Sequence, residues 1–311
     1  MKVLITGGAG FIGSHLSDRL LAGGHEVLAL DNYATGRRDN LTEQDGLTIV
    51  ENTIEDADAT LATFEDFGPE FVVHAAASYK DPEAWWQDAM TNTVGTVNVV
   101  RAAQATGVQR MLYFQTALCY GTTPIEQPVT LSHPIRPDSS YAISKTAGEQ
   151  YIELSGIEFL SFRLANAYGP RNISGPLPTF YHRLTEGKGV FVMDTRRDFI
   201  YADDLIDVVE QAVVSGKGSG HYHISSGSDF SIKELFDATI AALPEVQLDE
   251  EVEVRPKGED DAYTILLDPA KVREDFGWEP KTPLEEGVRG AIEYYRENGI
   301  EETFTHLKVA E

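Results

Sequence analysis

Two side chains in the middle of the chain have a spacing that suits proton transfer. Tyr141 and Lys145 stand four positions apart in Tyr141-Ala-Ile-Ser-Lys145, and residues at that spacing are neighbours on one face of a helix. A free tyrosine has a pKa of about 10, so a phenol that acts as a base at neutral pH needs positive charge nearby. Taken alone, the pair is also typical of a solvated helix face.

A hydroxyl group is expected close to this pair. Thr116 follows the apolar run Arg110–Gln115, for which we predict a strand. The carboxyl ends of the strands in an open α/β sheet face the ligand crevice. The Thr116 hydroxyl is therefore placed to share a substrate proton with Tyr141, and its alternative role is to cap the end of the strand.

A glycine-rich loop near the N-terminus carries a phosphate-binding pattern. In Thr6-Gly7-Gly8-Ala9-Gly10-Phe11-Ile12-Gly13 the glycines 7, 10 and 13 follow G-x-x-G-x-x-G spacing, a variant of the dinucleotide fingerprint. Glycine permits the tight turn and lets backbone amides approach a pyrophosphate at a helix N-terminus. The alternative is a plain glycine-rich turn.

An acidic residue after the second apolar run favours NAD over NADP. Asp31 ends the strand expected over Glu26–Leu30, where a carboxylate accepts hydrogen bonds from the adenosine ribose and repels a 2′-phosphate. Arg37 and Arg38 follow closely and could in principle meet a phosphate. We favour the simpler interpretation that they are surface arginines.

These residues need a parallel α/β scaffold, and the sequence pattern predicts one. Short apolar runs alternate with helical patterns, which favours a Rossmann-type doubly wound parallel sheet covered on both faces. We expect strands over Val3–Thr6, Glu26–Leu30, Leu47–Val50, Phe71–Ala75, Arg110–Gln115 and Glu158–Arg163, and helices near Ile12–Leu21, Ala59–Phe67, Glu83–Ala105 and Ser140–Leu154.

After Arg163 the alternation loosens, and a second, smaller unit is expected. Asn166–Pro178 is rich in proline and glycine, and Ser231 with Glu234 is a capping-box signal for a helix to about Leu243. Further helices are expected near 179–186 and 283–298, and strands near 190–193 and 221–225. We predict a Rossmann NAD-binding domain over residues 1–165 plus 199–226. An interwoven α/β cap that holds the substrate is predicted over 166–198 plus 227–311.

Composition excludes several classes of protein. The 311 residues contain 50 acidic and 25 basic side chains, a net charge of -25, and such a surface repels nucleic acid. The single cysteine, Cys119, excludes an internal disulfide and a thiolate cluster and fits a reducing compartment. No apolar run approaches the roughly 18 residues of a membrane span, and the first strand leaves no room for a signal peptide. We expect a soluble, cytoplasmic protein without membrane partners.

The combined motifs resemble the extended short-chain dehydrogenase/reductase family, in its NAD-dependent nucleotide-sugar epimerase/dehydratase branch. The resemblance covers nearly the whole chain. Beyond the motifs above it includes LDN at Leu30–Asn32, HAAA at His74–Ala77, NTVGT at Asn92–Thr96, FRLANAYGPR at Phe162–Arg171, RDFIYADD at Arg197–Asp204 and DFGW at Asp275–Trp278. The segments 77–82 and 114–121 look closest to UDP-sugar 4-epimerase-like members that are encoded with surface-polysaccharide pathways.

The resemblance implies roles for individual residues. It places the cofactor NAD against Gly7, Gly10, Phe11, Ile12, Gly13, Asp31, Asn32, Thr53, Ile54, Ala75, Ala76, Ala77, Asn92, Tyr141 and Lys145. It places a nucleoside-diphosphate sugar against Thr116, Asn166, Leu177, Phe180, Phe191, Arg197 and Arg255. The catalytic set it implies is Thr116, Tyr141 and Lys145.

Two departures from the family pattern matter. In members that are 4,6-dehydratases an Asp-Glu pair follows the threonine, whereas here Ala117 and Leu118 follow it and neither exchanges a proton. The usual R-P-G-D segment appears as Arg255-Pro-Lys-Gly-Glu259, which leaves open whether Arg255 or Lys257 contacts the substrate.

Other conspicuous residues have simpler interpretations. His74, His133, His221 and His223 lack the spacing of a metal site, so no metal is expected. For Trp85 and Trp86, core or subunit-contact packing is favoured over ligand stacking, and Cys119 is expected to be an inert buried thiol. The resemblance also implies a homodimer through the helices of 83–105 and 140–154.

The sequence therefore predicts an NAD-dependent 4-epimerase of a nucleoside-diphosphate sugar, with UDP the favoured nucleotide. In the expected reaction Tyr141, with a pKa lowered by Lys145 and the nicotinamide, takes the C4 hydroxyl proton and the sugar passes through a 4-keto form. Two alternatives stay open: a reductase or dehydrogenase with net redox change, and a non-catalytic NAD-binding regulatory protein.

Overall fold

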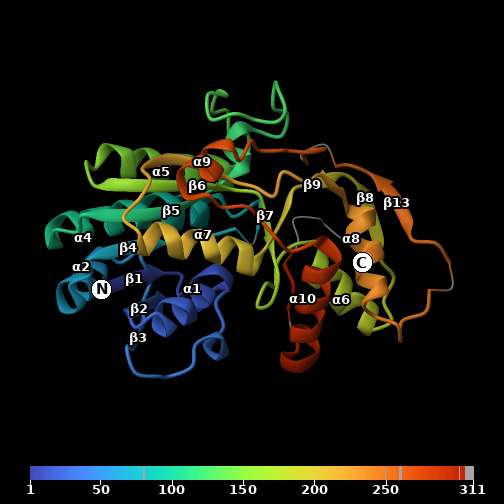
Figure 1. Ribbon diagram of the computed structural model, residues 1–311, viewed down its shortest axis with the longest axis horizontal. Coiled ribbons are helices and arrows are strands. Elements are labelled where there is room, and N and C mark those ends of the chain that lie inside the picture. The colour runs from blue at the N-terminus through green and yellow to red at the C-terminus, as the bar shows by residue number, and fades with distance from the viewer. Residues whose placement is uncertain (80, 249, 259–260, 301, 305–311) are drawn as a thin grey trace.

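Seven parallel strands form the sheet that carries the predicted site (Figure 1). The computed structural model describes residues 1–79, 81–248, 250–258, 261–300 and 302–304. The strand order is β11-β6-β5-β4-β1-β2-β3. The strands are β1 (Lys2–Thr6), β2 (Glu26–Asp31), β3 (Leu47–Glu51), β4 (Phe71–His74), β5 (Arg110–Thr116), β6 (Glu158–Leu164) and β11 (Gly220–Ile224).

Helices cover both faces of the sheet, because its strands are apolar on both sides. Val3 and Ile5 of β1 pack in one cluster and Leu4 packs in another, as expected since successive strand residues face opposite sides. The first face is covered by α1 (Phe11–Ala22), α7 (Ala202–Val214) and α9 (Ala270–Phe276). The second is covered by α2 (Ala57–Phe67), α4 (Thr96–Thr106) and α5 (Ser140–Leu154), with α3 (Trp85–Asp88) and the π-helical turn η2 (Ala89–Gly95) leading into α4.

A second lobe lies beside the sheet, on the right of Figure 1. Its core joins side chains of α6 (Pro176–Thr185), α8 (Ile232–Ala241) and α10 (Leu284–Asn298). Two short ladders complete it: β8 (Phe191–Asp194) with β13 (Glu253–Pro256), and β9 (Arg196–Arg197) with β12 (Phe230–Ser231). Between the lobes β7 (Asn166–Tyr168) pairs in parallel with β10 (Phe199–Tyr201). Short 3-10 turns are η1 (Arg38–Asn40) and η3 (Ala117–Tyr120).

The predicted sheet and its helices are confirmed, and so is the capping box of Ser231 with Glu234. The helix expected over Glu83–Ala105 is divided into α3, η2 and α4. The packing departs from the predicted domain division in one stretch. Val272, Phe276 and Trp278 belong to the apolar cluster of the first lobe, whereas 227–311 was assigned to the cap, because the chain returns to the sheet after leaving the second lobe.

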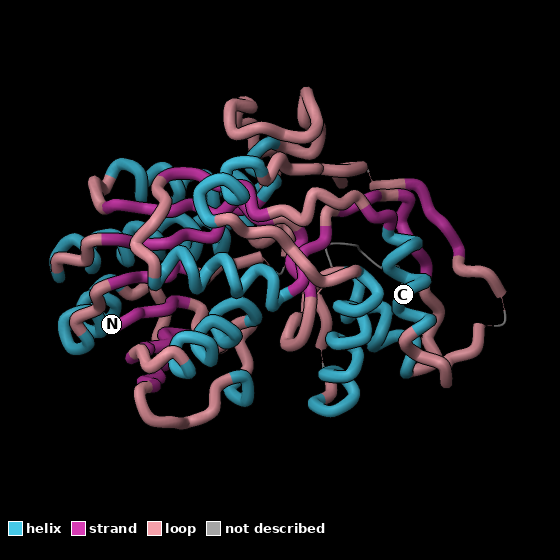
Figure 2. Tube along the Cα trace, viewed as in Figure 1, coloured by secondary structure: helices cyan, strands magenta, loops and turns pink. Residues whose placement is uncertain are grey.

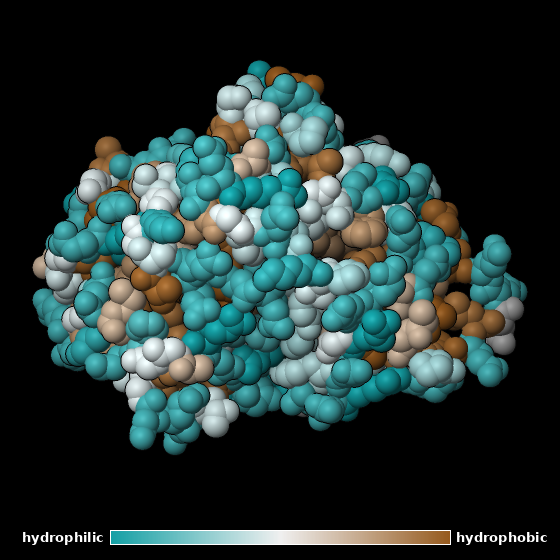
Figure 3. Space-filling view, viewed as in Figure 1, coloured by the Kyte–Doolittle hydropathy of each residue, from teal (hydrophilic) through white to brown (hydrophobic). Residues whose placement is uncertain are grey.

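The face of the molecule in Figure 3 is mostly hydrophilic, in keeping with the excess of acidic residues. Among the described residues, no helix is both long and apolar enough to span a bilayer.

One buried ion pair fastens α5 to the sheet. Glu149 of α5 and Arg163 of β6 are both almost fully buried, with a carboxylate oxygen 3.0 Å from the guanidinium. The carboxylate also accepts a hydrogen bond from the Ser161 hydroxyl. Arg163 holds the pKa of Glu149 below its usual value despite burial. Removal of one member leaves the other as a buried unpaired charge, which is more costly than removal of both.

We therefore expect Arg163→Leu to destabilise the protein by about 3 kcal/mol at neutral pH. The deficit should shrink toward pH 5, because burial without Arg163 raises the Glu149 pKa and the carboxyl is then neutralised at little cost. The double variant Glu149→Leu, Arg163→Leu should recover most of the loss. Urea unfolding at pH 7.5 and pH 5 measures both effects. A double variant less stable than Arg163→Leu would contradict this account.

Candidate functional site

The glycine loop after β1 is built by close backbone contacts. Gly7 has a φ of +70°, and a Cβ atom there would lie 2.7 Å from the Ala76 nitrogen. A Cβ atom on Gly13 would lie 2.2 Å from the Gly7 carbonyl oxygen. Both positions accept only glycine, so the turn, α1 and the segment after β4 meet with backbone against backbone.

The N-terminus of α1 presents backbone donors without competition from side chains. Gly10 is its N-cap and provides no side-chain hydrogen bond, and the first turn of α1, which includes Phe11 and Ile12, contains no acidic residue. The first N–H groups of a helix have no intrahelical partner, and they favour an anion such as a pyrophosphate. The residues therefore fit a dinucleotide.

Asp31 is held against the same loop. Its carboxylate accepts hydrogen bonds from the backbone N–H of Ala9 at 2.9 Å and of Tyr33 at 2.8 Å. Burial raises the Asp31 pKa, although these backbone donors oppose the rise. The next residue, Asn32, is exposed and accepts the N–H of Ala34.

Neither arginine that follows is turned to meet a ribose phosphate. Arg37 makes a two-pronged ion pair with Asp39. Arg38 pairs with Glu51 at 2.7 Å and stacks on the Tyr33 ring. Because both charges are matched by acids, the site favours NAD over NADP.

The turn after β4 lies against the glycine loop, with the Ala76 nitrogen 2.7 Å from the position of a Cβ atom on Gly7. Ala75 and Ala76 donate their backbone N–H groups to the carbonyl and hydroxyl oxygens of Thr6, and Ala77 leads into Ser78. Asn92 of η2 then accepts the Ser78 N–H at 2.8 Å and donates to the hydroxyl of Ser144 on α5 at 3.0 Å. Asn92 thus ties the turn to the helix that carries the tyrosine–lysine pair.

Thr53 and Ile54 follow shortly after the end of β3. Thr53 is partly buried, and its hydroxyl accepts the N–H of Glu55. Ile54 is 3% exposed and packs so closely on Gly95 that a Cβ atom there would lie 2.7 Å from its side chain.

The proposed catalytic side chains come from β5 and α5. Ser139 caps α5 by accepting the Ala142 N–H at 3.3 Å, so Tyr141 lies in the first turn and Lys145 one turn later. The ammonium of Lys145 lies 4.0 Å from the centre of the Tyr113 ring, and the Tyr113 hydroxyl donates to the Lys145 carbonyl oxygen at 2.9 Å. Thr116 ends β5, and its hydroxyl oxygen accepts the Leu118 N–H at 3.1 Å.

The electrostatics of this pair differ from the sequence-based expectation. Burial raises the Tyr141 pKa, and the nearby Tyr79 and Asp88 raise it further. Burial lowers the pKa of Lys145 to about 7, with Glu149 opposing the change. The groups of the chain itself therefore keep the Tyr141 pKa above its usual value, contrary to the predicted lowering, because burial disfavours the phenolate. A positively charged nicotinamide ring, when bound nearby, would act in the opposite direction and favour the phenolate.

The residues predicted to bind the sugar nucleotide have different surroundings in the structure. Asn166 is exposed, between the lobes, and donates to the Asp198 carbonyl oxygen. Leu177 and Phe180 are 2% and 5% exposed, and their side chains pack in the core of the second lobe.

Two basic residues of this lobe bind the segment at Asp261, and a third, Arg255, makes its contacts elsewhere. Arg197 donates to the Asp261 carboxylate at 2.7 Å and to the Ala262 carbonyl oxygen at 2.9 Å, and Lys257 donates to the Asp261 carbonyl oxygen. Arg255 instead stacks on Phe191, with 3.8 Å to the ring centre, and pairs with Glu253. Lys80 and Glu259, which belong to the motifs, lie outside the described residues.

Several contributors to the site were not anticipated from the sequence. His74 bridges the hydroxyls of Thr6 and Thr96 at 2.6 and 2.9 Å, and burial lowers its pKa to about 3, so it is a neutral support beneath the turn. Glu149 supports Lys145 one turn below. Its i+4 spacing from Lys145 was a signal that could have identified it.

The remaining residues have mainly structural surroundings. Burial raises the pKa of Cys119 to about 12, as expected of an inert thiol. Among the described residues Glu149, Glu153 and His221 are close enough to share a metal, but Arg163 already neutralises Glu149, which disfavours a cation there. Trp85 and Trp86 are 66% and 77% exposed, which rules out core packing for both.

Comparisons with known proteins agree with this arrangement. A family model described as NAD dependent epimerase/dehydratase family matches residues 3–225. A UDP-glucose 4-epimerase of Mycolicibacterium smegmatis is 34% identical, covering 95% of this chain and 99% of its own. A UDP-glucuronic acid decarboxylase of Xenopus tropicalis is 30% identical over 95% of this chain and 72% of its own.

Solved structures are also similar over nearly the whole chain. The Bordetella bronchiseptica enzyme WbmH, in complex with NAD+, is 52% identical with a TM-score of 0.92, covering 96% of this chain and 99% of its own. WbmG of the same organism, in complex with NAD and UDP, is 42% identical with a TM-score of 0.90, and the match covers 99% of both chains.

The buried ammonium should carry a cost in stability. With NAD removed from both proteins, we expect Lys145→Met to be more stable than the wild type by about 1–3 kcal/mol near pH 6. The unfolded chain holds this proton up to pH about 10.5 and the folded chain only to about 7, so the advantage should decline as the pH rises between those values. Thermal unfolding of both proteins from pH 6 to pH 10 measures the difference. A pH-independent difference would contradict the burial of a charged Lys145.

Proposed function

The chain belongs to the NAD-dependent epimerase/dehydratase family, and on that premise we propose that it inverts C4 of a nucleoside-diphosphate sugar, with UDP as the nucleotide. The observation that carries the proposal is Thr116 at the end of β5 with Tyr141 and Lys145 on α5, in a sheet whose first strand leads into a glycine turn, on a chain whose relatives include a UDP-glucose 4-epimerase. WbmG, with UDP bound, supports the choice of nucleotide.

The residues of the chain divide the chemistry among them. NAD, when bound, supplies a reversible hydride acceptor. Tyr141 takes the proton of the C4 hydroxyl as the C4–H bond breaks, so the sugar carbon becomes a carbonyl. The Thr116 hydroxyl bonds that same oxygen. Lys145 favours the phenolate form of Tyr141 once the nicotinamide ribose and the positively charged nicotinamide ring are bound.

Inversion then requires the keto sugar to present its other face before hydride returns and Tyr141 gives back the proton. In this proposal the diphosphate stays anchored during the rotation, and the guanidinium of Arg197, which pairs with Asp261 in this structure, binds it. Because hydride and proton are both restored, no net redox change results. This separates the proposal from a reductase or dehydrogenase.

The side chains after Thr116 argue against elimination of water. Ala117 is 9% exposed and packs with Leu118 in an apolar cluster. Neither exchanges a proton, so the acid and base of a 4,6-dehydratase are missing at these two positions. Decarboxylation of a sugar acid shares the oxidation at C4, and the substrate panel below distinguishes it.

The first test is to supply UDP-glucose, UDP-N-acetylglucosamine and UDP-glucuronate and follow the products by NMR. We expect at least one of these sugars to equilibrate with its C4 epimer without added cofactor. Tyr141→Phe should lose about 100-fold or more in kcat while retaining NAD, and Tyr151→Phe on the exposed side of α5 is the matched control. A pentose product with CO2 from UDP-glucuronate would indicate a decarboxylase. Steady NADH consumption would indicate a reductase, and hydride transfer to none of the sugars would favour a regulatory protein.

A homodimer is also part of the proposal. Val94 of η2 and Ile143 and Tyr151 of α5 are 40%, 55% and 45% exposed, so adjoining helices on one face of the sheet expose large apolar side chains, as an interaction surface does. A second copy of the chain is the proposed partner. A cytoplasmic location stays a prediction that rests on the single, buried cysteine.

We expect the double variant Val94→Glu, Tyr151→Glu to sediment as a monomer and the wild type as a dimer, because four charges would then meet in each interface. Val214→Glu is the matched control, since Val214 is 44% exposed on α7 at the opposite face of the sheet. A wild type that sediments as a monomer at micromolar concentration would refute the dimer.

A further inference from the structure

The chain crosses from the second lobe back to the first through residues 262–268, which we call the strap. It leads from β13 in the second lobe to α9 on the sheet (Figure 2). The strap belongs to no named strand or helix. Its course is fixed by hydrogen bonds to β9, to β11 and the loop after it, and to the loop after η3.

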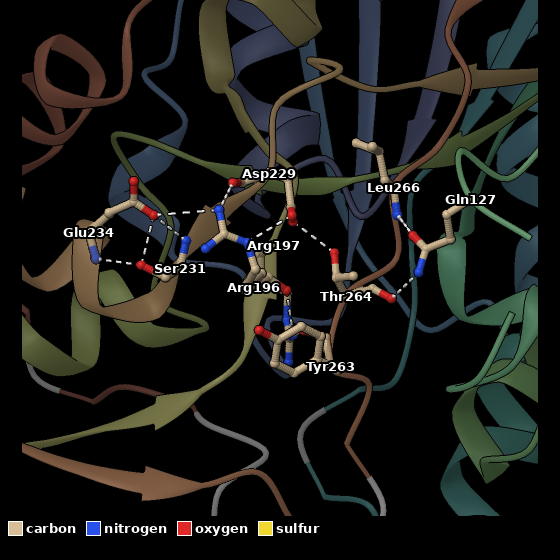
Figure 4. Close-up of polar contacts among 9 residues, drawn as sticks. All are labelled: Gln127, Arg196, Arg197, Asp229, Ser231, Glu234, Tyr263, Thr264 and Leu266. Carbon is tan, nitrogen blue, oxygen red and sulfur yellow. Dashed lines mark hydrogen bonds and ion pairs between the residues drawn. The ribbon is translucent and has the colours of Figure 1, made fainter.

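At its start the strap is bound to the second lobe. The N–H of Arg196 donates to the Tyr263 carbonyl oxygen at 2.7 Å, and Arg197 donates to the Ala262 carbonyl oxygen at 2.9 Å. The Thr264 hydroxyl donates to the Asp229 carboxylate at 2.8 Å, and the other oxygen of that carboxylate pairs with Arg196 (Figure 4). Arg197, the arginine proposed for the diphosphate, therefore touches the strap directly.

At its other end the strap is bound to the loop that follows η3, which projects from the molecule in Figure 1. The Gln127 side chain donates to the Thr264 carbonyl oxygen at 3.0 Å and accepts the Leu266 N–H at 2.7 Å. Val129 adds two backbone hydrogen bonds, to Leu266 and Asp268. Figure 4 shows Thr264 between Asp229 on one side and Gln127 on the other.

Apolar packing carries the contact on to the catalytic turn. Ile265 and Leu267 of the strap are 8% and 0% exposed and share a cluster with Ala117, Cys119 and Val129. Ala117 directly follows Thr116, whose hydroxyl is bonded to the Leu118 N–H in the same turn. The strap thus reaches from Arg197, the arginine proposed to bind the diphosphate, to the turn that follows Thr116.

We propose that the strap positions Thr116 relative to the diphosphate subsite, with Gln127 and Thr264 as its positioning residues. The inference rests on the proposed function for its catalytic consequence. A sugar whose diphosphate is anchored at Arg197 has its C4 oxygen at a fixed reach from that anchor. The Thr116 hydroxyl must lie at the same reach in both sugar orientations, and a small misplacement of reacting groups costs a large factor in rate.

The polar side chains are the place to test this, because they are accessible and their loss leaves the apolar cluster intact. Gln127 is exposed and Thr264 is partly buried. Gln127→Leu removes both side-chain bonds to the strap, and Thr264→Val removes the bond to Asp229 at nearly constant volume. Gln109→Leu and Thr185→Val are matched controls, since both side chains are exposed and bond only nearby carbonyl groups.

The first measurement does not depend on turnover. Amide hydrogen exchange of residues 116–130 is compared with and without saturating UDP. In the wild type and both controls UDP should slow exchange by about five-fold, because the diphosphate engages Arg197 at the start of the strap. In the variant Gln127→Leu, Thr264→Val this protection should be lost while UDP affinity stays within about two-fold. Equal protection in that variant and the wild type would overturn the proposal, as would no protection in the wild type.

The second measurement uses the sugar found by the substrate panel. The double variant should lose about ten-fold in kcat with little change in KM, and a larger fraction of enzyme should fluoresce as reduced cofactor, because a poorly held keto sugar escapes before hydride returns. Wild-type kcat in the variant would overturn the proposal. UDP protection that depends on Gln127 and Thr264, in a protein that epimerises no sugar, would refute the proposed function and leave the strap in place.

Discussion

The site depends on α5 holding a buried positive charge and a buried negative charge one turn apart. Lys145 is 2% exposed and lies over the Tyr113 ring, and Glu149 pairs with Arg163 of the neighbouring strand. An isolated buried charge is costly. The Tyr113 ring faces the Lys145 ammonium, and Arg163 pairs with the Glu149 carboxylate. The Glu149–Arg163 pair fixes the helix on the sheet, and Lys145 then has little freedom to move. The position of Tyr141 follows from that constraint.

The fold could be predicted from the sequence because its signals are local. Apolar runs such as Val3–Thr6 separated by helical patterns indicate a parallel sheet, and the capping box of Ser231 marks the start of α8. The glycine loop and Asp31 were predictable for the same reason, since each follows directly from a strand end. The burial of the Leu177 and Phe180 side chains in the core of the second lobe was not part of these local signals.

The electrostatics and the long-range contacts could not be predicted in the same way. The rise in the Tyr141 pKa comes from burial and from Tyr79 and Asp88, which lie far from Tyr141 in sequence. The hydrogen bond between Gln127 and Leu266 joins residues 139 positions apart in the sequence, and no periodic pattern indicates it. Such contacts depend on the assembled fold, so only coordinates reveal them.

The single cysteine offers a practical consequence. Cys119 is fully buried beneath Leu267 and Val129, and its thiol keeps its proton at physiological pH. Alkylating reagents attack the thiolate, so modification of the native chain must wait for this corner of the molecule to open. The rate at which a maleimide labels the native protein therefore reports how often the apolar cluster around Cys119 opens to solvent.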